Sequence, residues 1–208
     1  MPRPLIKVCG MTRMEDVQLC TDLGVDLLGF IFHPKSPRNA DPDFVASVRT
    51  GKVAKVGVFV DQTADEIIGI MDRCHLHAAQ LHGGHDCDAC EKIGPDRVIR
   101  AFWPQTYPSP EALVRDLERY AEVCGHFLLD AGGKGQGGTG RSIDFAALQH
   151  IEIQTPWFLA GGLGPHNVDA ALAVNPSGLD FNSGVESAPG IKDAAKLRAV
   201  FDRLASLE

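Results

Sequence analysis

A thiol and a carboxyl group each stand at the end of a short apolar segment of this chain. Cys9 follows the segment 5–8 and precedes a glycine, and Asp130 ends the segment 127–130 just before a long glycine-rich loop. Taken singly, Cys9 could be a packed thiol and Asp130 a residue that caps its own loop. Held at one site, a thiol and a carboxyl group can move protons on and off a small molecule. Cys9 and Asp130 are therefore candidate catalytic residues, provided that both segments end at the same edge of the fold.

Three glycine-rich turns point to a second kind of chemistry. They lie at 132–140, 161–162 and 182–184, each directly after an apolar segment in the last third of the chain. Glycine lets the backbone approach a ligand closely, and turns rich in free N–H groups form concavities that hold anions. The pattern predicts a site for a phosphorylated small molecule, whose candidate ligands are Gly138, Thr139, Gly161, Gly162, Ser183 and Gly184.

The composition narrows the function classes. The chain has 208 residues, a net charge of −7 and no basic run, which argues against nucleic acid as a partner. The longest apolar run, 27–32, is far too short to cross a bilayer, and the first four residues lack the apolar stretch of a signal peptide. We therefore expect a cytoplasmic enzyme whose six cysteines are free thiols, because a chain of this length needs no disulfides.

Alternating apolar and amphipathic segments indicate the elements that must position these residues. Eight apolar segments begin 19 to 30 residues apart, near Leu5, Leu27, Lys55, Ala79, Val98, Phe127, Trp157 and Gly178. Helices are predicted at 14–23, 42–48, 64–74, 88–93, 110–123, 143–150, 166–173 and 192–207, with Thr63, Ser109, Asp144 and Asn167 as capping or first-turn residues.

Eight strand–helix units predict the fold class α/β. Such alternation implies a parallel sheet with right-handed crossovers, and eight units close a (β/α)8 TIM barrel. We expect residues 1–208 to form one compact barrel with short loops, acting as a single catalytic domain. An open doubly wound sheet is the alternative architecture.

The alternation of side chains along a strand sorts the first segment into two faces. Ile6 and Val8 form an apolar face suited to the helix layer, so Lys7 and Cys9 point into the barrel. Barrel interiors are mostly apolar, which makes an inward lysine unusual. Either Lys7 pairs with a carboxylate such as Asp180 in a buried structural network, or it forms part of a polar site floor. The same sorting turns Gln80 and His82 inward, with Arg100 as a further inward candidate.

Several blocks of the sequence are similar to one known family. Lys7 to Thr12 (KVCGMT) opens the series, and the later blocks are GFIF at 29–32, SPR at 36–38, VGVF at 56–59, QLHG at 80–83, LD at 129–130, GGTG at 137–140, LAGGL at 159–163 and SGVE at 183–186. These blocks are collinear and span nearly the whole chain. Together they resemble the phosphoribosylanthranilate isomerases of tryptophan biosynthesis.

The resemblance implies a reaction and roles for particular residues. The family converts N-(5-phosphoribosyl)anthranilate to 1-(2-carboxyphenylamino)-1-deoxyribulose 5-phosphate, without metal or organic cofactor. The roles of general base and general acid fall on Cys9 and Asp130, and Arg38 is expected to hold the anthranilate carboxylate. Asp180 joins the substrate-binding residues, and Lys7 and His82 are candidate supporting residues.

The roles of base and acid each predict a shifted pKa. The pKa of Cys9 should lie below its ordinary value and that of Asp130 above it, because the base must lose its proton and the acid must keep it. The helix after the last strand should add a positive dipole end to the phosphate site.

Other functions remain open on the sequence alone. A metal site is the rival from another class, since Cys74, His75, His77, His82, His85, Cys87 and Cys90 fall within one segment. Within the fold, the rivals are an indole-glycerol-phosphate synthase, a sugar-phosphate epimerase and a dual-substrate isomerase shared with histidine biosynthesis. A non-catalytic binding module is a further alternative. The expected partner is a small phosphorylated substrate, and the expected assembly is a monomer or a homodimer.

Overall fold

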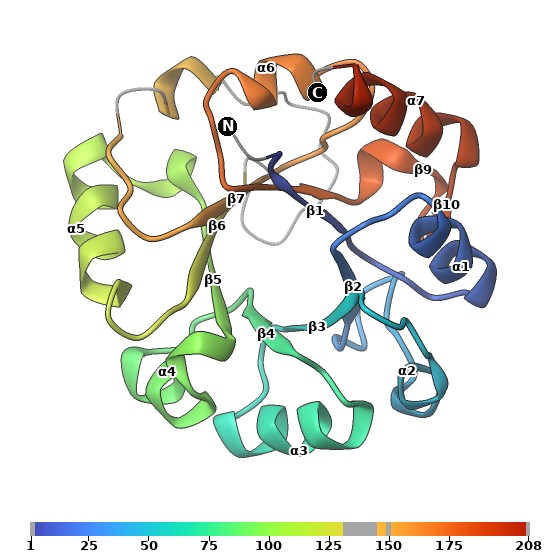
Figure 1. Ribbon diagram of the computed structural model, residues 1–208. Helices are drawn as coiled ribbons and strands as arrows, with labels where there is room; N and C mark the ends of the chain where they lie inside the picture. Colours follow the sequence, from blue (N-terminus) through green and yellow to red (C-terminus); the bar gives the residue numbers. More distant parts are fainter. Residues whose placement is uncertain (1–2, 131–144, 149–150, 207–208) are drawn as a thin grey trace.

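Eight parallel strands close into a barrel in the computed structural model, which describes residues 3–130, 145–148 and 151–206 (Figure 1). In chain order they are β1 (Leu5–Val8), β2 (Leu27–Ile31), β3 (Ala54–Phe59), β4 (Ala78–Leu81), β5 (Val98–Phe102), β6 (His126–Asp130), β7 (Trp157–Ala160) and β8 (Gly178–Phe181). β1 pairs with β8 in register, Leu5 with Gly178 and Val8 with Phe181, so the sheet has no open edge there. The predicted barrel is confirmed, and the open sheet is excluded.

Helices surround the barrel on its outside (Figure 1). They are α1 (Met14–Asp22), α2 (Pro42–Ser47), α3 (Ala64–Cys74), α4 (Cys87–Ile93), α5 (Pro110–Tyr120), α6 (Val168–Leu172) and α7 (Ala194–Ala205), with short 3-10 turns η1 (Pro95–Arg97), η2 (Pro104–Thr106), η3 (Phe145–Leu148) and η4 (Ser183–Val185). Of the helix predicted at 143–150, the structure describes only η3, and its expected cap Asp144 lies outside the described residues. No helix within the described ranges is long and apolar enough to span a bilayer.

The helix starts follow the capping signals in most places. Thr63 forms a capping box with Glu66 at the start of α3, and the Ser109 side chain accepts a hydrogen bond from the first turn of α5. Asn167 behaves differently, because its side chain accepts from Gly164 N at 2.8 Å and thereby closes the turn after β7.

The segment after β8 departs from the prediction. A short antiparallel hairpin, β9 (Glu186–Ala188) and β10 (Ile191–Lys192), separates η4 from α7. The helix predicted from residue 192 therefore starts two residues later, after the N-cap Asp193. A three-residue strand carries too few alternating positions to be recognised in a sequence.

Two apolar layers hold the barrel together. Ile6 and Val8 belong to the larger layer, between the strands and the helices. The smaller layer fills the barrel itself, and its buried members are Val56, Ile99, Ala101, Trp103, Leu128, Phe158 and Ala160. Strand residues thus alternate between the two layers, as parallel strands with two covered faces require.

Arg100 lies on the face opposite to the one expected. Its neighbours Ile99 and Ala101 face the barrel interior, so Arg100 points into the helix layer. There its Nη1 donates to Leu81 O at 3.1 Å and to Gly83 O at 2.8 Å. The inward placement was therefore wrong, and carbonyl oxygens accept hydrogen bonds from Nη1 of the guanidinium in the helix layer.

Lys55 fastens two helices to β3. Its side chain is buried, and Nζ donates to Val45 O at 3.0 Å, to Val48 O at 3.3 Å and to Cys74 O at 2.6 Å. These carbonyls lie in or just after the last turn of α2 and at the end of α3, where a cation is favourable. Burial lowers the pKa of Lys55, because removing an ammonium from water costs free energy. The three hydrogen bonds offset this desolvation cost.

We expect Lys55→Met to reduce the free energy of unfolding by about 2–4 kcal/mol, because buried carbonyls lose their donor. Urea denaturation of the purified variant measures this loss. Lys52→Met, at an exposed position of the preceding loop, serves as the matched control and should change the value by less than about 0.5 kcal/mol. A loss for Lys55→Met no larger than that of the control would contradict the role assigned to Lys55.

Candidate active site

Cys9 and Asp130 lie at the same end of the barrel. Cys9 directly follows β1, Asp130 is the last residue of β6, and parallel strands end at one rim. Cys9 faces inward over β2, since a Cβ added to Gly29 would lie 2.6 Å from its Sγ. Asp130 has the parity of Leu128, which lines the barrel interior. The structure thus places the two residues singled out first at the same rim, the end where barrel enzymes hold their chemistry.

Lys7 and Asp180 form an ion pair inside the barrel. They are register partners on β1 and β8, and Lys7 Nζ lies 2.8 Å from Asp180 Oδ2. The Lys7 side chain is completely buried, and the nearby Cys9 thiolate would favour its charged form as the Asp180 carboxylate does. The other carboxylate oxygen of Asp180, Oδ1, is buried without a hydrogen-bond partner among the described residues. The predicted ion pair between Lys7 and Asp180 is therefore present, and both of its charges act on the pKa of Cys9, the candidate base.

The pKa of Cys9 is shifted in the direction opposite to the one expected. Burial raises it, the Lys7 ammonium opposes this, and the Asp180 carboxylate adds to the rise. The expectation was wrong because burial of the thiol outweighs the effect of the Lys7 ammonium, and the Asp180 carboxylate acts in the same direction as burial. Burial raises the pKa of Asp180 as well, against the pull of Lys7. One buried cation therefore serves two groups that compete for it.

His82 lies beside Asp130 as a neutral imidazole. Its Nε2 is 3.7 Å from Asp130 Oδ2, and its ring packs edge-on against Trp103. Burial, together with the cations of Lys7 and Arg100, lowers the pKa of His82 to about 4. The ring therefore adds no positive charge next to Asp130 at neutral pH. Its Nδ1 lies 3.4 Å from Gln80 Nε2, and both side chains face inward as predicted.

The turns after β7 and β8 pack backbone against backbone. Gly161 and Gly162 have φ values of 109° and 70°, which favour glycine. A Cβ on Gly184 would lie 2.1 Å from Leu163 O, so no side chain fits there. Ser183 opens η4 beside this contact. The predicted phosphate ligands Gly138 and Thr139 lie outside the described residues.

The last helix does not offer a free N-terminus to this site. Asp193 Oδ1 accepts hydrogen bonds from Ala195 N at 2.9 Å and from Lys196 N at 3.1 Å. Asp193 thus already caps two first-turn amides of α7, and the expected contribution of its dipole end to phosphate binding stays a prediction.

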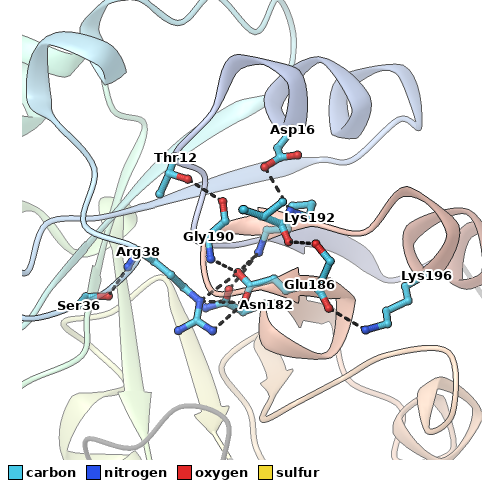
Figure 2. Close-up of polar contacts among 11 residues, drawn as sticks. Thr12, Asp16, Ser36, Arg38, Asn182, Glu186, Gly190, Lys192 and Lys196 are labelled. Carbon is cyan, nitrogen blue, oxygen red and sulfur yellow. Dashed lines mark hydrogen bonds and ion pairs between the residues drawn. The ribbon is translucent and has the colours of Figure 1, made fainter.

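Arg38 reaches the mouth from the loop after β2, where it meets Glu186 (Figure 2). Its Nη2 lies 2.6 Å from Glu186 Oε2, and its backbone N donates to Ser36 Oγ at 3.1 Å. Burial raises the pKa of Glu186, but hydrogen bonds with Arg38 and Lys192 outweigh this and lower it. Sequence reasoning quoted Glu186 only as the end of a motif and did not single out Lys192. The contacts of Glu186 with Arg38 and Lys192 have no signal in residue spacing.

The cysteine and histidine residues at 74–90 have separate partners. Cys74 Sγ donates to Pro42 O at 3.4 Å, and His85 Nε2 hydrogen-bonds with Gln62 O at 2.9 Å. Across residues 3–130, 145–148 and 151–206, no group of three or more His, Cys, Asp or Glu side chains is arranged to hold a metal ion.

Comparison with known proteins decides between the remaining alternatives. The family model for N-(5'-phosphoribosyl)anthranilate (PRA) isomerase matches residues 6–203. The chain belongs to this isomerase family. A curated PRA isomerase of Maridesulfovibrio salexigens is 48% identical over 198 residues, covering 95% of this chain and 96% of that protein.

Solved PRA isomerase structures share the fold over their whole length. The crystal structure of the Thermus thermophilus enzyme has a TM-score of 0.85 at 38% identity, and 98% of this chain and 99% of that chain are covered. Another PRA isomerase structure is a complex with reduced 1-(o-carboxyphenylamino)-1-deoxyribulose 5-phosphate, with a TM-score of 0.79, 29% identity and coverage of 98% and 99%. Membership in this isomerase family sets the chain apart from the rival barrels and from a non-catalytic module.

We expect Lys7→Met and Asp180→Asn to change the reactivity of Cys9 in opposite directions. Without Lys7 the thiolate loses its cation, so iodoacetamide should modify Cys9 roughly tenfold more slowly at pH 7. With Asn at position 180, Lys7 serves the thiol alone, so modification should be faster by about the same factor. Peptide mass spectrometry of Cys9 measures the rate, with the partly exposed Cys87 as the internal control. Faster modification in both variants would show loosened packing instead of shared charge.

Proposed function

We propose that this protein catalyses the Amadori rearrangement of N-(5-phosphoribosyl)anthranilate to 1-(2-carboxyphenylamino)-1-deoxyribulose 5-phosphate in tryptophan biosynthesis. The family match supports the reaction. The observation that carries the assignment of residues is the pair of inward-facing groups at one rim, Cys9 after β1 and Asp130 at the end of β6. In this proposal Cys9 is the general base and Asp130 the general acid.

The reaction needs only proton transfers, because it is an internal aldose-to-ketose shift. Asp130 gives its proton to the ring oxygen of the ribose, the bond from C1 to that oxygen breaks, and the nitrogen lone pair forms an iminium. The iminium acidifies the C2 proton, which the Cys9 thiolate removes to give an enolamine. Uptake of a proton at C1 and loss of the enol proton then yield the ketone. Each positioned acid or base typically contributes ~10²–10⁴-fold.

The Lys7–Asp180 pair supplies a route to the thiolate. The three groups hold the same protons in two arrangements: a Cys9 thiol with an Asp180 carboxylate, or a Cys9 thiolate with a protonated Asp180. Lys7 stays an ammonium in both. Burial raises the pKa of Asp180, which favours the second arrangement, and raises the pKa of Cys9, which favours the first. A positive iminium next to the thiol favours the second arrangement, so we infer that the base forms as the ring opens.

His82 supports the acid by staying neutral. A cation 3.7 Å from Asp130 Oδ2 would favour the carboxylate and remove its proton, but the pKa of His82 is about 4. We therefore expect Asp130 to keep its proton near neutral pH, with His82 as a supporting residue.

Different parts of the site bind the two anionic groups of the substrate, its phosphate and its carboxylate. The phosphate lies against the turns after β7 and β8, with Gly161, Gly162, Ser183 and Gly184 as ligands, together with Gly138 and Thr139. The Arg38 guanidinium holds the anthranilate carboxylate through bidentate hydrogen bonds. The unpartnered Oδ1 of Asp180 is available to a sugar hydroxyl. Fixing both ends holds C2 between the base and the acid.

The redox state of the cysteines indicates the compartment in which the enzyme works. All six cysteines are free thiols in the structure. A catalytic thiol must stay reduced, so we propose that the enzyme works in the cytoplasm. We propose a monomer or a homodimer as the assembly.

We expect Cys9→Ala and Asp130→Asn each to lower kcat by ~10²–10⁴-fold, because each removes one proton-transfer group. The loss of substrate fluorescence as the ring rearranges measures turnover, and circular dichroism checks that the fold persists. Cys87→Ala, outside the barrel mouth, is the matched control and should keep normal turnover. Near-normal turnover in a folded Cys9 or Asp130 variant would remove that residue from the mechanism.

Arg38→Met should act chiefly on binding. We expect KM to rise by about 10–100-fold and kcat to fall much less, because a charge-assisted bidentate contact with the substrate is lost. Steady-state kinetics with the same assay measures both constants. An unchanged KM would count against the carboxylate role of Arg38.

A further inference from the structure

Glu186 contacts two cations at the barrel mouth, Arg38 and Lys192 (Figure 2). Its side chain is only 4% exposed. Arg38 Nε lies 3.0 Å from each carboxylate oxygen, and Arg38 Nη2 lies 2.6 Å from Oε2. Glu186 thus occupies the edge of the guanidinium formed by Nε and Nη2. Because the guanidinium is planar, its other edge, formed by Nη1 and the second N–H of Nη2, faces away from Glu186.

Other groups hold Glu186 itself in place. Lys192 Nζ donates to its Oε1 at 2.9 Å, and Gly190 N donates to the same oxygen at 3.2 Å. Lys192 is tied in turn to Asn182 Oδ1 at 3.0 Å, and its backbone N donates to Asp16 Oδ2 at 3.2 Å. The hairpin β9–β10 therefore presents a carboxylate whose position is set from several sides.

The backbone at Gly10 also confines Arg38. A Cβ added to Gly10 would lie 2.9 Å from Arg38 Cδ and 2.8 Å from Asn182 Oδ1. The stem of Arg38 thus passes directly over the glycine that follows Cys9. Its side chain is 13% exposed, so a long and flexible residue is held in one place. This arrangement removes much of the rotamer entropy that ligand binding would otherwise cost.

We propose that Glu186 is a positioning residue, which fixes Arg38 so that its free edge meets the carboxylate of the substrate. The inference rests on the proposed function, in which Arg38 binds that carboxylate. Glu186 also separates two cations, Arg38 and Lys192, that it contacts at the same time. Buried like charges without a counter-ion are unfavourable, so without the negative charge Arg38 turns out toward solvent. The negative charge at position 186 therefore favours binding of an anion by keeping the cation in place.

The test compares two product analogues that differ only in the carboxylate. One is reduced 1-(2-carboxyphenylamino)-1-deoxyribulose 5-phosphate, and the other is the same compound with an unsubstituted phenyl ring. Isothermal titration gives the Kd of each for the wild-type protein, Glu186→Gln and Arg38→Met. We expect Glu186→Gln to raise the Kd of the carboxylate compound by about 10–100-fold and that of the phenyl compound by less than about 3-fold. With substrate, KM should rise similarly while kcat stays near normal.

The results for Glu186→Gln and Arg38→Met distinguish a failure of the positioning role of Glu186 from a failure of the carboxylate-binding role of Arg38. If Glu186→Gln weakens both analogues equally, or tightens the carboxylate compound, the positioning role is overturned while the role of Arg38 stands. If Arg38→Met weakens both analogues equally, the carboxylate role in the proposed function is overturned, and this inference falls with it. In the double variant, the preference for the carboxylate compound should be no lower than in Arg38→Met alone, because Glu186 acts through Arg38.

Two further variants control for folding. Glu122→Gln makes the same change at an exposed position and should leave both Kd values unchanged. Glu186→Asp keeps the negative charge on a shorter side chain, so it should restore part of the carboxylate preference. If Glu186→Gln does not fold, Glu186→Asp carries the test: a selective loss for the carboxylate compound supports the proposal, and an equal loss for both overturns it.

Discussion

A lysine ammonium bonded to a carboxylate inside the barrel is the interaction on which the site depends. Lys7 and Asp180 face each other across the seam where β1 meets β8, at 2.8 Å. A buried ion pair contributes little net stability, because desolvation offsets most of the attraction. Its larger effect is on Cys9, which competes with Asp180 for the same cation. The same two residues therefore lie across the seam that closes the barrel and influence the pKa of the candidate base.

The other buried charges at the barrel mouth also have partners of opposite charge. Arg38 meets Glu186, and Glu186 meets Lys192. Deeper in the helix layer, three carbonyls at or near the ends of α2 and α3 surround the Lys55 ammonium. Each pairing holds a loop or helix against the strands, so the charged residues of this protein join elements distant in sequence.

The periodicity of the sequence predicted the strands and their faces well. Lys7, Cys9, Gln80 and His82 point inward because side-chain direction in a strand depends only on parity once one face is known. Arg100 was misplaced because the other residues of β5, VIRAF, are apolar on both faces, so parity did not show which face of this strand lies inward. In the structure Ile99 and Ala101 face the barrel interior, and Arg100 faces the helix layer.

By itself, the sequence determined the eight-fold alternation, the glycine turns and the family to which the chain belongs, because these are local patterns or collinear motifs. Only the tertiary structure decided which charges meet. The raised pKa of Cys9 and the contact between Arg38 and Glu186 both arise from residues brought together by folding. Electrostatic effects depend on distance and burial, and neither quantity is written in the order of residues.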